Sequence, residues 1–146
     1  MDLLTSYMGV YYETVLNELR LMNKTTISPN ITYNSLLYLE LIAYKEDCTV
    51  SYLAERLHVT KSAVTLKVNE LIGAGLVQKT QSKADKRVYY LTLTDIAKND
   101  YRNYDKPLQQ AMERIKNKYS STEIATVISV LNEIREEYVK TNETEN

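Results

Sequence analysis

The feature that most constrains the fold of this sequence is the stretch TVSYLAERLHVTKSAVTLKVNELIGAGLV at residues 49–77. Thr49 and Thr60 each stand where a hydroxyl can cap the free backbone N–H groups of a following helix. Gly75 suits the position just past the second helix, where a left-handed backbone is easiest without a side chain. The inner faces of the two helices are predicted to be Val50, Leu53, Ala54 and Leu57, and Val64, Val68, Leu71 and Ile72. Two short capped helices joined by a tight turn predict a helix-turn-helix.

The residues that follow this motif change from helical to strand periodicity. The period of the apolar side chains falls towards two over residues 76–81 and is two over residues 87–94. The segment SKADK at residues 82–86 joins these two predicted strands into a hairpin. The basic side chains near the hairpin tip are Lys83, Lys86 and Arg87. A helix-turn-helix followed by a hairpin predicts a winged helix.

Two helices are predicted before the helix-turn-helix. Apolar residues recur at steps of four and three along residues 3–23, which is typical of an amphipathic helix with one narrow seam. The stretch NKTTISPN at residues 23–30 is predicted to end this helix. Thr32 can then cap a second helix that runs to about Tyr44. On this helix Leu36, Leu39 and Ala43 are predicted to share one face, with Tyr33 and Leu37 nearby.

Two further helices are predicted after the hairpin. Thr94 can cap a long helix over residues 95–119, whose apolar residues step by four and three as in a coiled coil. Pro107 removes one backbone hydrogen bond and should kink or split this helix. Ser120 and Glu123 form a capping-box pair for the last helix. The sequence therefore predicts a mainly α fold with a small β-hairpin wing.

The length of 146 residues is enough for one domain or for one half of a dimer. With 44% hydrophobic and 25% charged residues, the chain is neither disordered nor fibrous by composition. The apolar seams of the terminal helices exceed what the small middle region can cover, so we expect a homodimer, although such seams also occur inside monomeric cores. No run of 18 apolar residues and no signal-peptide pattern is present, so we expect a cytoplasmic protein without a membrane partner.

The net charge of −1 conceals a strong asymmetry along the chain. Between Arg56 and Arg87 there are seven basic residues and only two acidic ones. A local basic patch on a nearly neutral protein indicates a polyanionic partner. The single Cys48 and single His58 exclude an internal disulfide and disfavour a metal site, so we expect neither a metal nor another cofactor.

The second helix of the helix-turn-helix can enter the major groove of double-stranded DNA while the hairpin tip reaches an adjacent minor groove. Its outer face, predicted to contact bases or phosphates, carries Lys61, Ser62, Thr65, Leu66, Lys67 and Asn69. Lys61 can also reinforce the positive helix terminus against a phosphate. The alternative interpretation is an ordinary solvated face, but the basic hairpin immediately downstream favours contact with DNA.

On these residues the chain resembles the MarR family of transcriptional regulators. The most specific part is D-x-R followed by L-x-L-T, here Asp85, Arg87, Leu91, Leu93 and Thr94. The resemblance covers nearly the whole chain. It implies one MarR-like domain over residues 1–146, with a winged-helix DNA-binding lobe at about 32–95 and a helical dimerisation region at about 1–24 and 96–142.

The same resemblance implies what the protein does. It implies a homodimer that binds a palindromic site in double-stranded DNA, as a repressor whose DNA affinity a small ligand modulates. Arg87 would be the wing arginine that enters the minor groove, and Asp85 would hold it through a salt bridge.

Several positions depart from the family pattern, among them Ala97, which replaces a frequent glycine after L-T. Leu66 and Glu70 stand where the family often has basic residues. Either Lys67 supplies the missing charge, or Leu66 contacts a thymine methyl group. His58 stands where a glycine is common in the turn, and a left-handed backbone explains it better than a sensor role does.

The resemblance also implies a small phenolic or carboxylate ligand in a crevice between the dimerisation helices and the winged helix. The tyrosines on helices that would line this crevice are Tyr7, Tyr11, Tyr12, Tyr33 and Tyr38. A tyrosine offers an aromatic ring and a hydroxyl to such a ligand. The alternative is that these tyrosines fill core positions in place of phenylalanine. Cys48 does not stand where the family has a peroxide-sensing cysteine.

Two other classes of function compete with DNA binding. A winged helix can serve protein association without a DNA site. An enzyme is disfavoured, because the sequence has no Gly-rich phosphate loop and only one His and one Cys. We therefore expect a non-enzymatic DNA-binding regulator.

Overall fold

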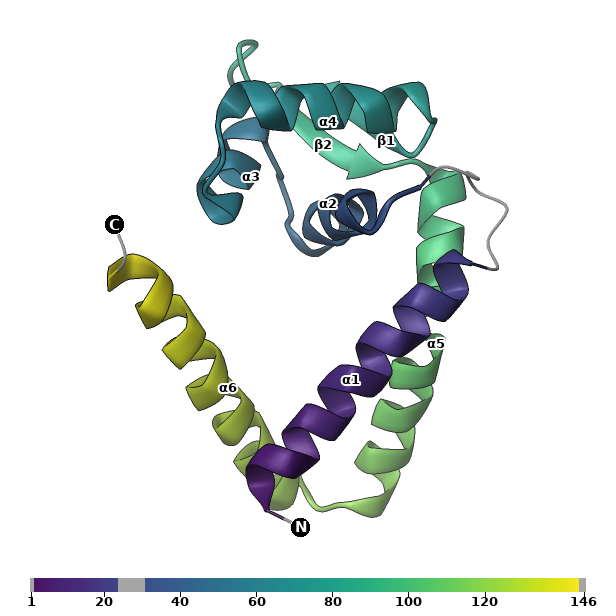
Figure 1. The fold of residues 1–146 in the computed structure, drawn as a ribbon, viewed down its shortest axis with the longest axis vertical. Coiled ribbons are helices and arrows are strands. Elements are labelled where there is room, and N and C mark those ends of the chain that lie inside the picture. The colour runs from purple at the N-terminus through teal and green to yellow at the C-terminus, as the bar shows by residue number, and fades with distance from the viewer. Residues whose placement is uncertain (1, 24–30, 145–146) are drawn as a thin grey trace. The chain divides into compact units, whose positions relative to one another are not determined.

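The computed structural model describes residues 2–23 and 31–144 and has six helices and one hairpin in these ranges (Figure 1). The elements in chain order are α1 (Leu3–Met22), α2 (Tyr33–Tyr44), α3 (Val50–Leu57), α4 (Lys61–Gly73), β1 (Val77–Gln81), β2 (Tyr89–Leu93), α5 (Asp95–Lys118) and α6 (Ser121–Thr144). The predicted fold class, mainly α with a small β-hairpin wing, is confirmed. Residues 24–30, which contain most of the predicted break after the first helix, lie outside the described residues.

The chain divides into two compact units, Met1–Tyr104 and Asp105–Asn146. The first unit contains the winged helix, in which α3 packs on α4, and α2 packs on β2. The largest side chains at its centre are fully buried, and they are Leu53, Leu71, Leu91, Val64, Val68 and Val77. Burial of each such aliphatic side chain contributes about 1.5–3 kcal/mol, so this core holds the helix-turn-helix against the hairpin.

Helices α2, α3 and α4 of the first unit begin at the predicted caps. Thr32 accepts a hydrogen bond from the backbone N–H of Ser35, and Thr49 accepts one from Tyr52. Thr60 does the same for the N–H of Ala63 at the start of α4, with an O···N distance of 3.2 Å. These bonds satisfy donors that a helix leaves free at its N-terminus, which is why the helices begin where they do.

The three residues predicted to share one face of α2 differ in burial. Leu36 and Leu39 are buried as expected, but Ala43 is exposed, while Tyr38 and Ile42 are buried. Ala43 lies in the last turn of α2, where it lines an open cavity of about 390 Å³ instead of packing against the core. Ala43 therefore does not belong to the core that buries Leu36 and Leu39.

The hairpin pairs β1 with β2 in antiparallel register, from Val77 opposite Leu93 to Gln81 opposite Tyr89. A third segment joins it, because the backbone N–H of Leu91 donates to the carbonyl of Cys48 at 2.8 Å. Leu91 and Leu93 point into the core, whereas Tyr89 is 48% exposed near the loop although it shares their side of the strand. Tyr89 lies beyond the edge of the core that covers Leu91 and Leu93.

Pro107 lies inside α5, which continues through it as one helix from Asp95 to Lys118. Of the two outcomes predicted for Pro107, a kink or a split, the split is absent. The division between the two compact units falls between Tyr104 and Asp105, within the turn that precedes the proline. Proline has no backbone N–H to donate to the carbonyl four residues before it, so this turn lacks one helical hydrogen bond.

The predicted capping box at the start of α6 is confirmed. The backbone N–H of Ser120 donates to Glu123 Oε2 at 2.8 Å, and the N–H of Glu123 donates to Ser120 Oγ at 3.3 Å. The hydroxyl of Ser120 also donates to Glu123 Oε2 at 2.7 Å, and this bond, with the one from the Ser120 N–H, holds the pKa of the Glu123 carboxyl below its usual value.

Many apolar side chains on the long helices are exposed in the single chain. On α1 they are Leu3, Leu4, Val10, Tyr11, Tyr12, Leu16 and Leu19. On α5 and its end they are Ile96, Leu108, Met112, Ile115 and Tyr119, and on α6 they are Val127, Ile128, Leu131, Tyr138 and Val139. None of the described helices combines the length and the apolar character needed to cross a membrane.

Candidate nucleic-acid interface

The outer face of α4 is defined by the residues that α4 buries. Val64, Val68 and Leu71 are fixed in the core, so the opposite side of the helix must face solvent. Ser62, Leu66 and Asn69 follow one another at steps of four and three, which places them in one row on that side. We call these three residues the outer stripe. All three are exposed, and Lys61 and Thr65 are exposed beside them.

Lys67 does not lie with the outer stripe. Its side chain is only 15% exposed, and its Nζ lies 3.0 Å from both carboxylate oxygens of Glu70. The ammonium group is therefore engaged within the helix instead of pointing outward. This geometry disfavours the interpretation in which Lys67 replaces the missing basic residues of the outer face.

The loop of the wing is held by hydrogen bonds of its own residues. The side chain of Ser82 is buried and accepts hydrogen bonds from the backbone N–H groups of Ala84 and Asp85. The N–H of Val88 donates to the carbonyl of Asp85, and the N–H of Ser82 donates to the carbonyl of Val88. The loop thus has a defined conformation on which Lys83 and Lys86 are exposed.

Asp85 and Arg87 interact at the tip of this loop. The guanidinium of Arg87 donates through Nε and one terminal nitrogen to the two oxygens of Asp85, each at 3.2 Å. The backbone N–H of Arg87 donates to the same carboxylate at 2.9 Å. These bonds hold the pKa of the Asp85 carboxyl below its usual value, so it stays ionised as an acceptor. Arg87 is nevertheless 91% exposed, and its remaining donors face solvent.

Three residues that the sequence did not single out support this surface. The amide of Gln81 donates to the carbonyl of Lys86 at 2.6 Å and to the hydroxyl of Tyr89 at 3.2 Å. Lys79 Nζ donates to the side-chain oxygen of Asn69 at 3.4 Å, which connects β1 with the outer stripe. Gln81 and Tyr89 lie opposite each other in the strand register, so a correct alignment of the two strands would have indicated their contact.

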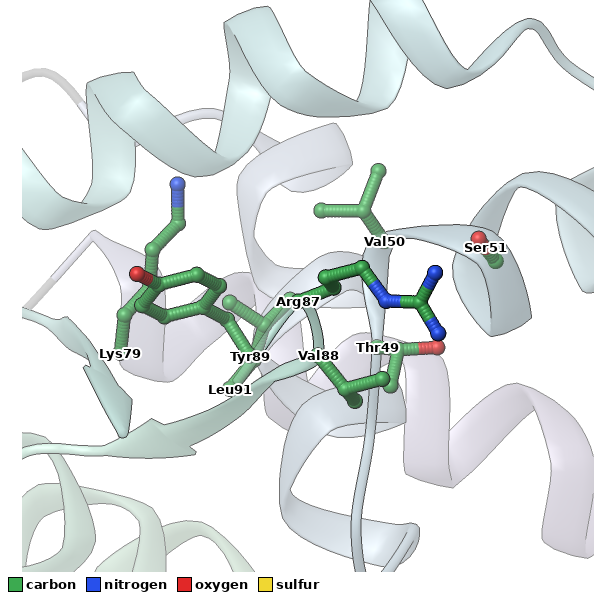
Figure 2. Close-up of a pocket in the computed structure, with 8 residues that line it drawn as sticks. All are labelled: Thr49, Val50, Ser51, Lys79, Arg87, Val88, Tyr89 and Leu91. Carbon is green, nitrogen blue, oxygen red and sulfur yellow. The ribbon is translucent and has the colours of Figure 1, made fainter. Parts of the chain in front are cut away.

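A cavity of about 540 Å³ lies between the start of α3 and the base of the wing. Its lining residues are Thr49, Val50, Ser51, Lys79, Arg87, Val88, Tyr89 and Leu91. Figure 2 shows the guanidinium of Arg87 directed towards Thr49 and Ser51, with Lys79 and the ring of Tyr89 at the other end. The wing arginine thus lies over the N-terminal turn of α3, and its backbone is continuous with the strand that packs on the core.

The five tyrosines predicted to line a ligand crevice have different surroundings. Tyr38 is buried in the core, which favours the packing interpretation for this residue. Tyr33 is partly exposed, and its pKa is raised by desolvation and by the nearby carboxylates of Glu18 and Glu40. Tyr11 and Tyr12 are exposed on α1 with their ring centroids 5.6 Å apart, and Tyr7 is half-buried. Neither the cavity beside Ala43 nor the cavity beneath Arg87 is lined by any of these five residues.

His58 and Cys48, the two residues considered as sensors, are both explained by their place in the fold. His58 ends α3 with φ of 52°, the left-handed conformation predicted for it. Cys48 is fully buried, and burial raises the pKa of its thiol to about 11. Over residues 2–23 and 31–144, no three His, Cys, Asp or Glu side chains are grouped so that they could hold a metal ion.

Comparison with known sequences places the site in a family. The model of the MarR family matches residues 31–89, from the start of the α2 region to the first residue of β2. A curated relative from Bacillus subtilis, the uncharacterised HTH-type transcriptional regulator YvnA, is 27% identical over 104 residues. That alignment covers 69% of this chain and 66% of the relative, so the chain spans just under two thirds of the relative's length.

Solved structures extend the comparison to nearly the whole chain. FabT of Streptococcus pneumoniae, solved in complex with DNA, is 23% identical with a TM-score of 0.65, over 94% of this chain and 96% of that one. MarR of Staphylococcus aureus, solved in complex with salicylate and kanamycin, is 26% identical with a TM-score of 0.60, over 94% and 90%. The resemblance found in the sequence is thus confirmed, because residues 31–89 match the model of the MarR family.

Proposed function

We propose that this protein is a sequence-specific DNA-binding transcriptional regulator that acts as a repressor. The observation that carries the proposal is that two exposed surfaces, the outer stripe of α4 and the wing, are joined in one compact unit. The outer stripe of α4 and the wing are connected through Lys79 and Asn69. A helix of this kind can enter the major groove while the wing tip reaches the adjacent minor groove. The name of the relative YvnA supports the same assignment.

In this proposal, the charged and polar side chains of the winged helix make different contacts with DNA. Lys83 and Lys86 are exposed on the wing and contact phosphates, which release counterions on binding. Arg87 is held by Asp85 in a fixed orientation and inserts its free donors into the minor groove. Ser62, Thr65 and Asn69 donate to or accept from base edges, and Lys61 contacts a phosphate at the start of α4. Lys67 contributes through its pair with Glu70, which keeps the carboxylate from repelling the DNA backbone.

The active species in this proposal is a homodimer on a palindromic site. The exposed apolar residues of α1, α5 and α6 are the surface that a second copy of the chain covers. A two-fold symmetric protein presents two winged helices to two half-sites related by the same symmetry. The domain organisation inferred from the resemblance, with terminal helices for pairing and a central lobe for DNA, is part of this proposal.

A small phenolic or carboxylate ligand lowers the DNA affinity in this proposal. Two observations support it. Tyr33 on α2 lies close enough to Tyr11 and Glu18 of α1 for their charges to affect its pKa, so aromatic and polar groups of the two helices come together. The S. aureus MarR structure contains salicylate, which is both phenolic and a carboxylate. A ligand at this place would bind between a pairing helix and the winged helix.

The role of Arg87 can be tested by substitution. Arg87→Ala should weaken binding to the cognate duplex by about 1–3 kcal/mol, because a groove contact is lost. Fluorescence anisotropy with a labelled operator measures this change. Lys116→Ala removes an exposed basic residue on α5 outside the winged helix and serves as the matched control, with little change expected. The affinity of the unmodified protein should fall steeply as the salt concentration rises.

The same measurements can contradict the proposal. Equal affinity of the Arg87→Ala variant and the unmodified protein for the operator would exclude a groove contact by Arg87. A protein that shifts no duplex DNA, but binds a protein partner with little dependence on salt, would instead be a winged-helix module for protein association.

A further inference from the structure

Leu66 has an unusual position for a large apolar side chain. It is 75% exposed, although α4 buries Val64, Val68 and Leu71 on its other side. It follows Ser62 by one turn and precedes Asn69 by one turn, so it lies at the middle of the outer stripe. The centre of the surface offered to the major groove is therefore a hydrocarbon group.

The major groove offers few partners to such a group. Base edges there present hydrogen-bond donors and acceptors, except for the C5-methyl group of thymine. An isobutyl side chain packed against the polar atoms of a base edge would remove water from them without replacing their hydrogen bonds. Contact with a thymine methyl group instead removes apolar surface of both partners from water.

The neighbouring side chains do not supply the usual means of reading guanine. Arginine or lysine donates to guanine O6 and N7 in the commonest specific contact. All of α4 is described, and it contains no arginine. Its two lysines are Lys61, at the first position of the helix, and Lys67, which binds both oxygens of Glu70. α4 thus supplies no free cationic group to a guanine at the middle of the outer stripe, and Lys79 of β1 donates to Asn69 at the end of the stripe.

We propose that Leu66 is a specificity-determining residue, which reads the C5-methyl group of a thymine at the middle of each half-site. The proposal rests on the proposed function as a DNA-binding protein and names the chemistry that this site recognises. It predicts a T·A pair beneath Leu66, selected through apolar contact. The neighbouring Lys67 then pairs with Glu70 and does not contact the base.

The test uses the full-length protein and a duplex selected from random sequences. Each thymine of the selected half-site is replaced in turn by deoxyuridine, which removes the methyl group and keeps every hydrogen-bonding atom. At one position, the replacement should weaken binding about fourfold per half-site, the equivalent of one buried methyl group. In the Leu66→Ala variant, the thymine and deoxyuridine duplexes should bind equally at that position. This variant is expected to fold, because the side chain is largely exposed.

Two matched variants distinguish the loss of this contact from a general weakening of DNA binding. Leu66→Met keeps an apolar contact and should keep the preference for thymine. Ser62→Ala, one turn away in the outer stripe, should change affinity for both duplexes by the same factor. A preference for thymine that survives in Leu66→Ala, or no preference in the unmodified protein, would overturn the assignment of Leu66 while leaving DNA binding intact. Failure to select any duplex would overturn the proposed function itself.

Discussion

The chemistry of Cys48 depends on where its backbone lies. Its carbonyl accepts the N–H of Leu91, and this bridge places the thiol in the core with no exposed surface. Burial disfavours the thiolate, and the resulting pKa of about 11 lies well above the usual value of 9.0. At pH 8 only roughly one thiol in a thousand would be ionised, since each pH unit below the pKa lowers that fraction tenfold.

Cys48 should therefore react slowly with a disulfide reagent in the folded protein. The thiolate is the reactive species, and the folded chain both protects and protonates the sulfur. The rate of labelling at pH 8 should be far lower in the native protein than in denaturant, and it should rise with pH towards 11. A double variant, Cys48→Ala with Ser51→Cys, places a thiol at a nearby exposed position and should react quickly. Equal rates for the native protein and this control would contradict the inertness of Cys48.

At the scale of elements, Thr94 connects the end of the hairpin to two helices. Its hydroxyl donates to the carbonyl of Gly75 at 2.7 Å, in the turn that follows α4. The same oxygen accepts the N–H of Ala97 at 3.3 Å and so caps α5, as the sequence predicted. One side chain thus fixes where β2 ends, where α5 begins and how the turn after α4 is held.

Replacement of this hydroxyl should destabilise the winged helix. Thr94→Val keeps the shape but removes both hydrogen bonds, and we expect the free energy of unfolding to fall by about 1–2 kcal/mol. Thr94→Ser keeps the hydroxyl and should lose clearly less. Urea unfolding followed by circular dichroism measures both variants. If Thr94→Val were as stable as the unmodified protein, the two bonds would have no net effect on stability.

At the scale of the whole molecule, the exposed apolar residues of α1, α5 and α6 require a partner in the proposed function. Exposed apolar patches of this extent indicate an interface. The unmodified protein, with a chain mass of 16.9 kDa, should therefore sediment as a dimer at micromolar concentrations. Leu131→Glu places a charge in the apolar seam of α6 and should shift the protein towards the monomer.

Ser129 provides the control for this experiment. It is exposed on α6 two residues before Leu131, on another side of the helix, so Ser129→Glu should leave the dimer unchanged. Sedimentation velocity measures all three proteins. A monomeric unmodified protein would exclude the homodimer, and equal effects of the two substitutions would exclude the predicted seam on α6.

Much of the fold could be predicted from the sequence because its determinants are local. The caps Thr32, Thr49, Thr60 and Thr94, the capping box of Ser120 and Glu123, and the left-handed turn at His58 all depend on residues within four positions. The pair of Lys67 with Glu70 is equally local, at a spacing of three, and could have been predicted from that spacing. The sequence by itself therefore determined the helix-turn-helix, the hairpin and the start of each capped helix within a residue or two.

Other features were decided only when distant segments packed together. The bridge of Cys48 to Leu91, the contact of Lys79 with Asn69 and the exposure of Ala43 have no signal in local periodicity. A side chain's partners across the core depend on the register of the strands and on where each neighbouring helix ends. The strand register and the helix ends are set by the burial of apolar side chains over the whole unit. Many different local sequence patterns allow the same burial, so the local pattern alone does not predict them. By burying Val64, Val68 and Leu71, the tertiary structure left Leu66 as the exposed apolar centre of the predicted recognition surface.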